Sequence, residues 1–312
     1  MTLSYPLSPE LAGFVAASLE FTALEPSIQG QREAYSRMCR AYTPAHPAGL
    51  ALINTRLADV PVRLYRPEQP ETRDAACVIY LHGGGWVVGD LDSHDFITAP
   101  LAMDLNAVVI AVDYRLAPEH PFPAAFHDCL AVWHAVQEQA QSLGIDPRRV
   151  AVAGDSAGGN LAAAVCLALR DAGQPQPVGQ ALVYPGLGGA ESLPSRSECA
   201  DAPLLSITDV DCYKALYLSR REHYQAPYAM PLNATDYRSL PPAFIAVAQF
   251  DPLRDDGVLY EQRLREAGVA TEFDPGLGLV HGCLRARGEA PEVDALYGRL
   301  VQALLGFLAV NV

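Results

Sequence analysis

The segment Gly154-Asp-Ser-Ala-Gly158 has the glycine-x-serine-x-glycine pattern that places a serine at a tight turn between a strand and a helix. It directly follows the apolar run 150–153 and precedes the helix-forming run that starts at Asn160. Small flanking residues leave room for the neighbouring strand and helix, so the Ser156 hydroxyl would project above the sheet. The pattern alone also fits an ordinary glycine-rich turn, but this strand-helix context favours a nucleophilic serine.

Three consecutive glycines, Gly83, Gly84 and Gly85, follow His82 at the end of another apolar run. Their backbone N–H groups, with that of Ala157 at the positive end of the following helix, are suited to binding a developing oxyanion. A phosphate-binding loop is disfavoured, because the run lacks the glycine and lysine spacing of such loops. We therefore predict an oxyanion hole here and interpret His82 as a brace for the loop.

A serine nucleophile needs a base and an orienting acid, which in doubly wound hydrolases follow it in the order acid, then histidine. Asp251 directly follows the apolar run 243–249, at the strand end where ligands gather in open α/β sheets. Of the eight histidines, only His281 lies beyond Asp251. The predicted catalytic residues are therefore Ser156, Asp251 and His281.

Several other titratable residues are not assigned to catalysis. Asp255 and Asp256 suit the N-cap and first turn of a helix, where negative charge is favourable for structural reasons. No role is assigned to the histidines that precede Asp251 and lie outside the glycine loop: His46, His94, His120, His127, His134 and His223.

The elements that must position these residues alternate along the chain. Apolar or β-branched runs predict strands at 52–57, 60–65, 76–81, 107–112, 150–154, 180–184, 243–249 and 270–273. Helical patterns lie at 94–105, 124–142, 157–171, 256–267 and 291–309. This alternation predicts an α/β fold with a mostly parallel, doubly wound sheet. Only Ala58 and Asp59 separate the first two runs, which favours an antiparallel hairpin there.

Two stretches do not fit the alternation and are assigned to a helical cap. Residues 1–48 precede the catalytic domain, 49–312, and residues 187–238 form an insertion with a helical pattern at 208–220. The N-terminal apolar stretch is interpreted as an amphipathic helix capped at Ser8, because no basic residue precedes it as in a signal peptide.

The composition of the 312 residues limits the classes of molecule that are expected to bind the protein. The 36 acidic and 22 basic residues give a net charge of −14, which would repel nucleic acid and anionic membrane surfaces. No apolar run approaches the roughly 18 residues of a membrane span. Seven cysteines without paired spacing favour reduced thiols, a cytoplasmic location and no metal site. A homo-oligomer is left open.

The ordered motifs together resemble the hormone-sensitive-lipase-like carboxylesterases, the bacterial family IV of the α/β-hydrolases. The resemblance extends from about residue 50 to the end and rests on 82–86 (His-Gly-Gly-Gly-Trp), 113–119 (Asp-Tyr-Arg-Leu-Ala-Pro-Glu), 154–159, 251–255 and 281–282. It implies an eight-stranded, mostly parallel sheet flanked by helices, a helical cap, and hydrolysis of short- to medium-chain acyl esters without a cofactor.

The resemblance also implies a role for each matching residue. Ser156 would be the nucleophile, His281 the base and Asp251 its orienting acid, with the glycine-loop N–H groups, chiefly those of Gly84 and Gly85, and that of Ala157 as the oxyanion hole. Within the motif 113–119, Arg115 and Glu119 would brace the loop beside the active site. The family commonly has an aromatic residue where this chain has Cys283, which leaves the shape of the pocket wall near His281 open.

Two alternatives accompany the carboxylesterase hypothesis. The same catalytic residues would also cleave activated amides. An amide or formamide hydrolase is therefore the alternative enzymatic activity. A non-catalytic receptor for a small ligand would require a missing serine or histidine, and both are present. An interfacial lipase is disfavoured by the absence of an export signal.

Overall fold

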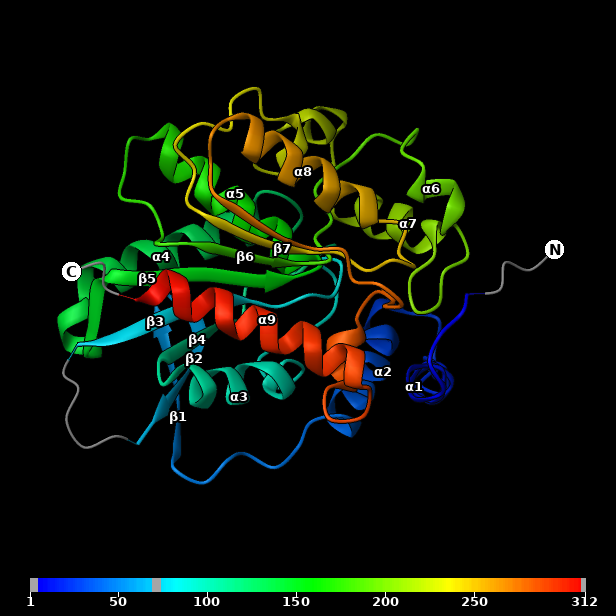
Figure 1. Cartoon of the computed structure of the whole chain (residues 1–312), viewed down its shortest axis with the longest axis horizontal. Coiled ribbons are helices and arrows are strands. Elements are labelled where there is room, and N and C mark those ends of the chain that lie inside the picture. The colour runs from blue at the N-terminus through cyan, green and yellow to red at the C-terminus, as the bar shows by residue number, and fades with distance from the viewer. Residues whose placement is uncertain (1–4, 69–73, 310–312) are drawn as a thin grey trace.

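One eight-stranded sheet organises the chain in the computed structural model, which describes residues 5–68 and 74–309 (Figure 1). The strand order is β1-β2-β4-β3-β5-β6-β7-β8, with β2 antiparallel to both β1 and β4 and the remaining pairs parallel. The bounds are β1 Leu50–Leu57, β2 Val60–Pro67, β3 Ala75–Leu81, β4 Val108–Val112, β5 Ile145–Asp155, β6 Gln180–Val183, β7 Ala243–Ala246 and β8 Thr271–Asp274. All eight predicted strands and the antiparallel start are confirmed.

The turn between β1 and β2 has the backbone conformation that a two-residue hairpin needs. Ala58 and Asp59 have φ values of 47° and 63°, and positive φ at both central positions matches the twist of the flanking strands. The predicted hairpin is therefore present.

Helices cover both faces of the sheet, as expected for a doubly wound fold (Figure 1). On one face lie α4 (Ala124–Leu143), α5 (Ala157–Asp171) and α8 (Arg254–Glu266), and on the other lie α3 (Asp95–Leu105) and α9 (Pro291–Leu308). Within β3, Ile79 packs into the first layer, whereas Val78 and Tyr80 pack into the second. This strand is apolar throughout because both of its faces are buried.

The segments outside the alternation gather near the carboxyl ends of the parallel strands (Figure 1). At the N-terminus they form α1 (Pro9–Leu19), whose first turn is capped by the Ser8 hydroxyl, and α2 (Ile28–Ala41). Between β6 and β7 they form α6 (Ser195–Glu198), α7 (Ile207–Tyr217) and the 3-10 turns η1 (Arg221–Gln225) and η2 (Pro231–Asn233). We call residues 5–48 and 187–238 the covering segments.

Candidate active site

The turn between β5 and α5 holds Ser156 in an unusual backbone conformation. Its φ is 55° and its ψ −120°, which is strained for a residue with a side chain and typical of a nucleophile at a strand-to-helix turn. A Cβ atom on Gly158 would overlap the carbonyl of Leu81, and one on Gly154 would crowd the backbone of Gly158. The two glycines are therefore needed for the close approach of α5 to β3 and β5.

Ser156, His281 and Asp251 form one continuous hydrogen-bonded chain. His281 Nε2 lies 2.9 Å from Ser156 Oγ, and His281 Nδ1 lies 2.6 Å from Asp251 Oδ2. Asp251 is fully buried, and its Oδ1 accepts a hydrogen bond of 2.7 Å from the Leu253 N–H. Because a buried carboxylate fixes the imidazole ring, His281 Nε2 is positioned to take the hydroxyl proton.

The loops after β7 and β8 contact each other directly. This explains how Asp251 and His281 form a pair although they are 30 positions apart in the sequence. Phe250 bridges Val280 in the manner of parallel strands, and the Phe250 N–H donates to the Leu279 carbonyl at 2.9 Å. The His281 ring also packs 4.7 Å from the Tyr184 ring, centroid to centroid. Backbone pairing and packing thus hold the acid and the histidine in register.

The glycine loop presents fewer free N–H groups than the sequence suggested. The Gly83 N–H already donates to Asp155 Oδ1 at 3.1 Å, so it is not available to a substrate. Within the described residues, no acceptor is hydrogen-bonded to the N–H groups of Gly84, Gly85 or Ala157. The expectation for Gly83 is therefore corrected, because the carboxylate beside the serine uses its N–H to fix the loop.

A buried histidine to which the sequence analysis gave no role supports the same loop. His94 Nε2 lies 3.2 Å from the Gly83 nitrogen and 3.3 Å from Asp155 Oδ1. Such a contact carries no local sequence signal, because His94 precedes α3 and meets Asp155 only through the fold. The omission of His94 was thus an error that needed tertiary contacts to correct.

His82 lies where a brace for the glycine loop is expected. Its Nδ1 is 2.7 Å from the Gly83 carbonyl oxygen, and its ring stacks on Tyr114 at 4.2 Å. Burial, followed by the neighbouring His94, lowers the pKa of His82 to about 4. The imidazole is therefore neutral near neutral pH, which suits a structural contact rather than proton transfer.

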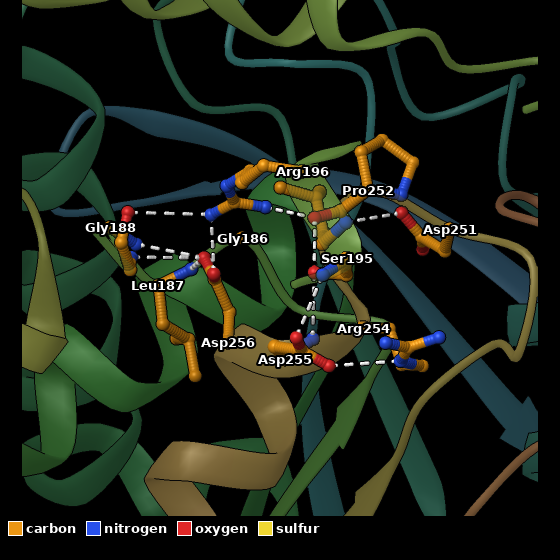
Figure 2. Close-up of polar contacts among 12 residues, drawn as sticks. Gly186, Leu187, Gly188, Ser195, Arg196, Asp251, Pro252, Arg254, Asp255 and Asp256 are labelled. Atoms are coloured by element: carbon orange, nitrogen blue, oxygen red, sulfur yellow. Dashed lines mark hydrogen bonds and ion pairs between the residues drawn. The ribbon is translucent and has the colours of Figure 1, made fainter. Parts of the chain in front are cut away.

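Asp255 and Asp256 lie in the first turn of α8, as expected, but they do not cap it. Asp255 accepts from the Ser195 N–H at 2.8 Å, and Asp256 accepts from the Leu187 N–H at 2.8 Å and pairs with Arg196. Figure 2 shows the two carboxylates reaching in different directions toward the segment after β6. Their role is structural, but it is not the helix capping that the sequence suggested. The two carboxylates attach the covering segment 187–238 to the core.

Residues of the motif 113–119 bond both to the glycine loop and to helices. The Tyr114 hydroxyl donates to the His82 carbonyl at 2.7 Å, and the Ala117 N–H donates to the Trp86 carbonyl at 2.8 Å. Arg115 pairs with Asp128 of α4 at 2.7 Å, and Glu119 pairs with Arg32 of α2 at 2.6 Å. Arg32 also donates to the Val87 carbonyl at 2.8 Å, just beyond the glycines. Glu119 therefore braces this region through α2, whereas Arg115 joins its loop to α4.

Ser156 and His281 open onto a cavity of about 350 Å³. Its walls come from the glycine loop, from the ends of α1 and α2, and from the insertion, with largely apolar side chains: Leu19, Phe21, Met38, Leu204, Leu205, Val210, Tyr213 and Met230. A wider, charged cleft of about 930 Å³ lies beside α2 and contains none of the three predicted catalytic residues. Of these two, only the smaller cavity is therefore in contact with Ser156 and His281.

Cys283 does not line this cavity. Its side chain is fully buried, and burial raises the pKa of its thiol well above the usual range. The pocket wall after His281 is instead formed by Gly282 and Arg285. Within residues 5–68 and 74–309, no group of His, Cys, Asp and Glu side chains is suited to hold a metal ion.

Comparisons with known proteins agree with this geometry. A family model described as the alpha/beta hydrolase fold matches residues 78–285. The carboxylesterase NlhH of Mycobacterium tuberculosis is 44% identical over 80% of this chain and 78% of its own, and an ethyl acetate hydrolase of Pseudomonas putida is 39% identical over 78% of each.

A solved structure shows the same architecture over nearly the whole chain. A thermostable esterase from Pseudomonas putida superposes with a TM-score of 0.92 at 27% identity, covering 99% of this chain and 100% of the other. The chain therefore belongs to the hormone-sensitive-lipase-like, family IV branch of the α/β-hydrolases, and it is a serine ester hydrolase.

Proposed function

We propose that Ser156 is the nucleophile of a carboxylesterase reaction, with His281 as general base and Asp251 as its orienting acid. The observation that carries this proposal is the hydrogen-bonded chain from Asp251 through His281 to Ser156, which opens onto the 350 Å³ cavity. A hydroxyl becomes a good nucleophile when an adjacent base accepts its proton in the transition state.

The reaction proceeds in two acyl transfers. Ser156 Oγ attacks the ester carbonyl while His281 Nε2 takes its proton, and the N–H groups of Gly84, Gly85 and Ala157 stabilise the negative oxygen. His281 then gives the proton to the departing alcohol. Water attacks the acyl-enzyme with His281 as base, and the carboxylic acid leaves.

The covering segments act as a cap that limits substrate size. The cavity walls include apolar side chains from both segments, and its 350 Å³ is near the lower end of ligand pockets. Each buried methylene contributes roughly 1 kcal/mol, so activity should rise with acyl length until the chain meets the cap. We therefore propose short- to medium-chain acyl esters as substrates.

The cellular setting is part of the same proposal. We propose a cytoplasmic enzyme that acts on small esters without nucleic-acid or membrane partners, supported by seven free cysteines and the net charge of −14. Among the described residues, no helix combines the length and the apolar character needed to cross a bilayer.

A series of p-nitrophenyl esters with two to sixteen acyl carbons tests the proposal. We expect kcat/KM to peak at about four to eight carbons, because longer chains must displace the cap. Activity should disappear in Ser156→Ala. A maximum at sixteen carbons would contradict the cap-limited pocket, and faster cleavage of a matched anilide than of the ester would favour an amide hydrolase.

A further inference from the structure

Three cationic side chains line the catalytic cavity, and one of them lacks a partner. Arg196 pairs with Asp256, and the Lys214 ammonium lies 3.1 Å from an Asp211 oxygen. In the part of the chain that the structure describes, Arg285 forms no hydrogen bond or salt bridge, and its Nε is buried without an acceptor. Only 8% of the Arg285 surface is exposed.

The position of Arg285 connects it to the catalytic histidine. It belongs to the 3-10 turn η3 (Cys283–Ala286), which directly follows His281 and Gly282. The Arg285 guanidinium lies over the Tyr35 ring of α2, with Cζ 5.8 Å from the ring centroid. The guanidinium therefore contacts an aromatic ring, and both Arg285 and Tyr35 are part of the cavity wall.

An unpaired guanidinium at this depth is energetically costly. Arginine stays protonated in proteins, so it cannot avoid the penalty of burial by losing its charge. The ring of Tyr35 offsets part of that penalty but satisfies none of the five N–H donors. A group that persists under these conditions is suited to a negative charge delivered by a ligand.

Asp155 is the acidic residue that could otherwise have neutralised Arg285. It lines the same cavity, yet its Oδ1 already accepts from the Tyr80 hydroxyl at 2.9 Å and from the Gly83 N–H. No salt bridge joins Asp155 to Arg285 in the described residues. Asp256 is likewise occupied by Arg196 and backbone N–H groups.

We propose that Arg285 is a specificity-determining residue that binds a carboxylate carried by the ester substrate. This inference rests on the proposed function, since it places the ester carbonyl at Ser156 in the same cavity. A guanidinium binds a carboxylate through two parallel hydrogen bonds, and the apolar walls would strengthen that pair by excluding water. The favoured substrates are monoesters of dicarboxylic acids, or acyl esters of hydroxy acids, over neutral esters of equal size.

Matched ester pairs separate charge from size. Monoethyl succinate and ethyl pentanoate differ in carrying a carboxylate or an ethyl group at the end of the acyl chain. Acetylglycolate and propyl acetate make the same exchange in the alcohol. For each pair, the ratio of kcat/KM for the anionic ester to that for the neutral ester is measured in wild type, Arg285→Met, Arg285→Lys and Arg287→Met.

Arg287 is the matched control because it lies in the same segment but outside the cavity, with Cζ 4.7 Å from the centroid of the Tyr297 ring. For at least one pair, we expect Arg285→Met to lower the ratio about tenfold to a hundredfold, mainly through KM, because a charge-assisted hydrogen bond is lost. Arg285→Lys should retain part of the preference for the anionic ester, and Arg287→Met should retain the full preference.

Thermal unfolding distinguishes substrate binding from a structural role. Removing a buried cation without a partner should leave the unfolding temperature of Arg285→Met equal to that of the wild type or higher. A lower unfolding temperature together with equal loss of activity on both esters would overturn the proposal, as would unchanged ratios in both pairs. A wild-type enzyme that hydrolyses none of the four esters would contradict the proposed function itself.

Discussion

The sheet edge and the covering segments are held in different ways, although both line the same cavity. At the sheet edge, backbone pairing of adjacent loops fixes Asp251 against His281, and short hydrogen bonds continue to Ser156. The covering segments are instead attached by side chains: buried apolar ones such as Leu11 and Tyr217, and polar pairs between residues far apart in the sequence, such as Arg196 with Asp256.

Residues at the sheet edge and residues of the covering segments should therefore affect different properties of the enzyme. The proposed proton-transfer groups lie in loops that follow strands, whereas most apolar side chains of the cavity wall belong to the covering segments. Changes at the sheet edge should therefore reduce turnover, and changes at the anchors should alter stability and substrate range.

The largest effect is expected at Asp251, which is compared with Asp255 in the first turn of α8, four residues further along the chain. Asp251→Asn should lower kcat/KM about a thousandfold or more, because the amide no longer holds His281 in the reactive tautomer. Asp255→Asn should cost far less, since Asp255 contacts Ser195 and Arg254 but not His281. Steady-state kinetics on one p-nitrophenyl ester decides this, and equal losses would show that Asp251 is not the orienting acid.

A smaller effect is expected where the insertion is anchored. Asp256→Asn leaves the Arg196 guanidinium buried without its counter-charge, so the free energy of unfolding should fall by about 3 kcal/mol. Chemical denaturation measures this change. Asp236→Asn is the matched control in the same segment, because the Asp236 pair with Arg238 is exposed, and its midpoint should stay at the wild-type value.

An Asp256→Asn variant as stable as Asp236→Asn would show that the insertion does not depend on this anchor. The attachment of the insertion would then not rest on side-chain pairs of this kind. A destabilised variant with a broader acyl-length profile would show that the covering segment had loosened while Ser156, His281 and Asp251 still worked.

The smallest effect concerns Asp113, in the loop after β4. Burial, followed by the charge of Asp90, raises the pKa of Asp113 to about 6. The folded state therefore holds this proton more tightly than the unfolded chain, and the free energy of unfolding decreases as pH rises from about 4 through 6. Asp113→Asn should be more stable than wild type above this window, by about 1 kcal/mol after allowing for solvent screening, and not below it.

Denaturant midpoints of wild type and Asp113→Asn at pH 4 and pH 7 give the measurement for this prediction. Asp74→Asn, at an exposed position, serves as control and should show the same difference from wild type at both pH values. A stability gain for Asp113→Asn that shrinks as pH rises would contradict a raised pKa for the Asp113 carboxyl.

The positions of the strands along the chain and the candidates for the triad could be predicted from the sequence because they depend on local signals. Apolar runs placed the eight strands, and the chain order of Ser156, Asp251 and His281 selected one histidine of eight. Ser156 directly follows β5, and Asp251 and His281 lie in the loops after β7 and β8, so the strand before each residue identifies it as a candidate.

Contacts between distant segments were not readable in this way. Nothing near Gly83 shows that its N–H would be taken by Asp155, and nothing near His94 links it to the same carboxylate. Arg285 was missed for the same reason: in the sequence it is one arginine among many, and that it forms no hydrogen bond or salt bridge with residues 5–68 and 74–309 emerges only from the fold.

Covalent labelling with a fluorophosphonate tests the central claim most directly, because only a serine activated by a neighbouring base reacts rapidly with it. We expect one label per active chain, mapped by peptide mass spectrometry to Ser156, with the labelling rate greatly reduced in His281→Ala. Label on a different serine, or an unchanged rate in His281→Ala, would contradict the assignment of Ser156 and His281 as nucleophile and base.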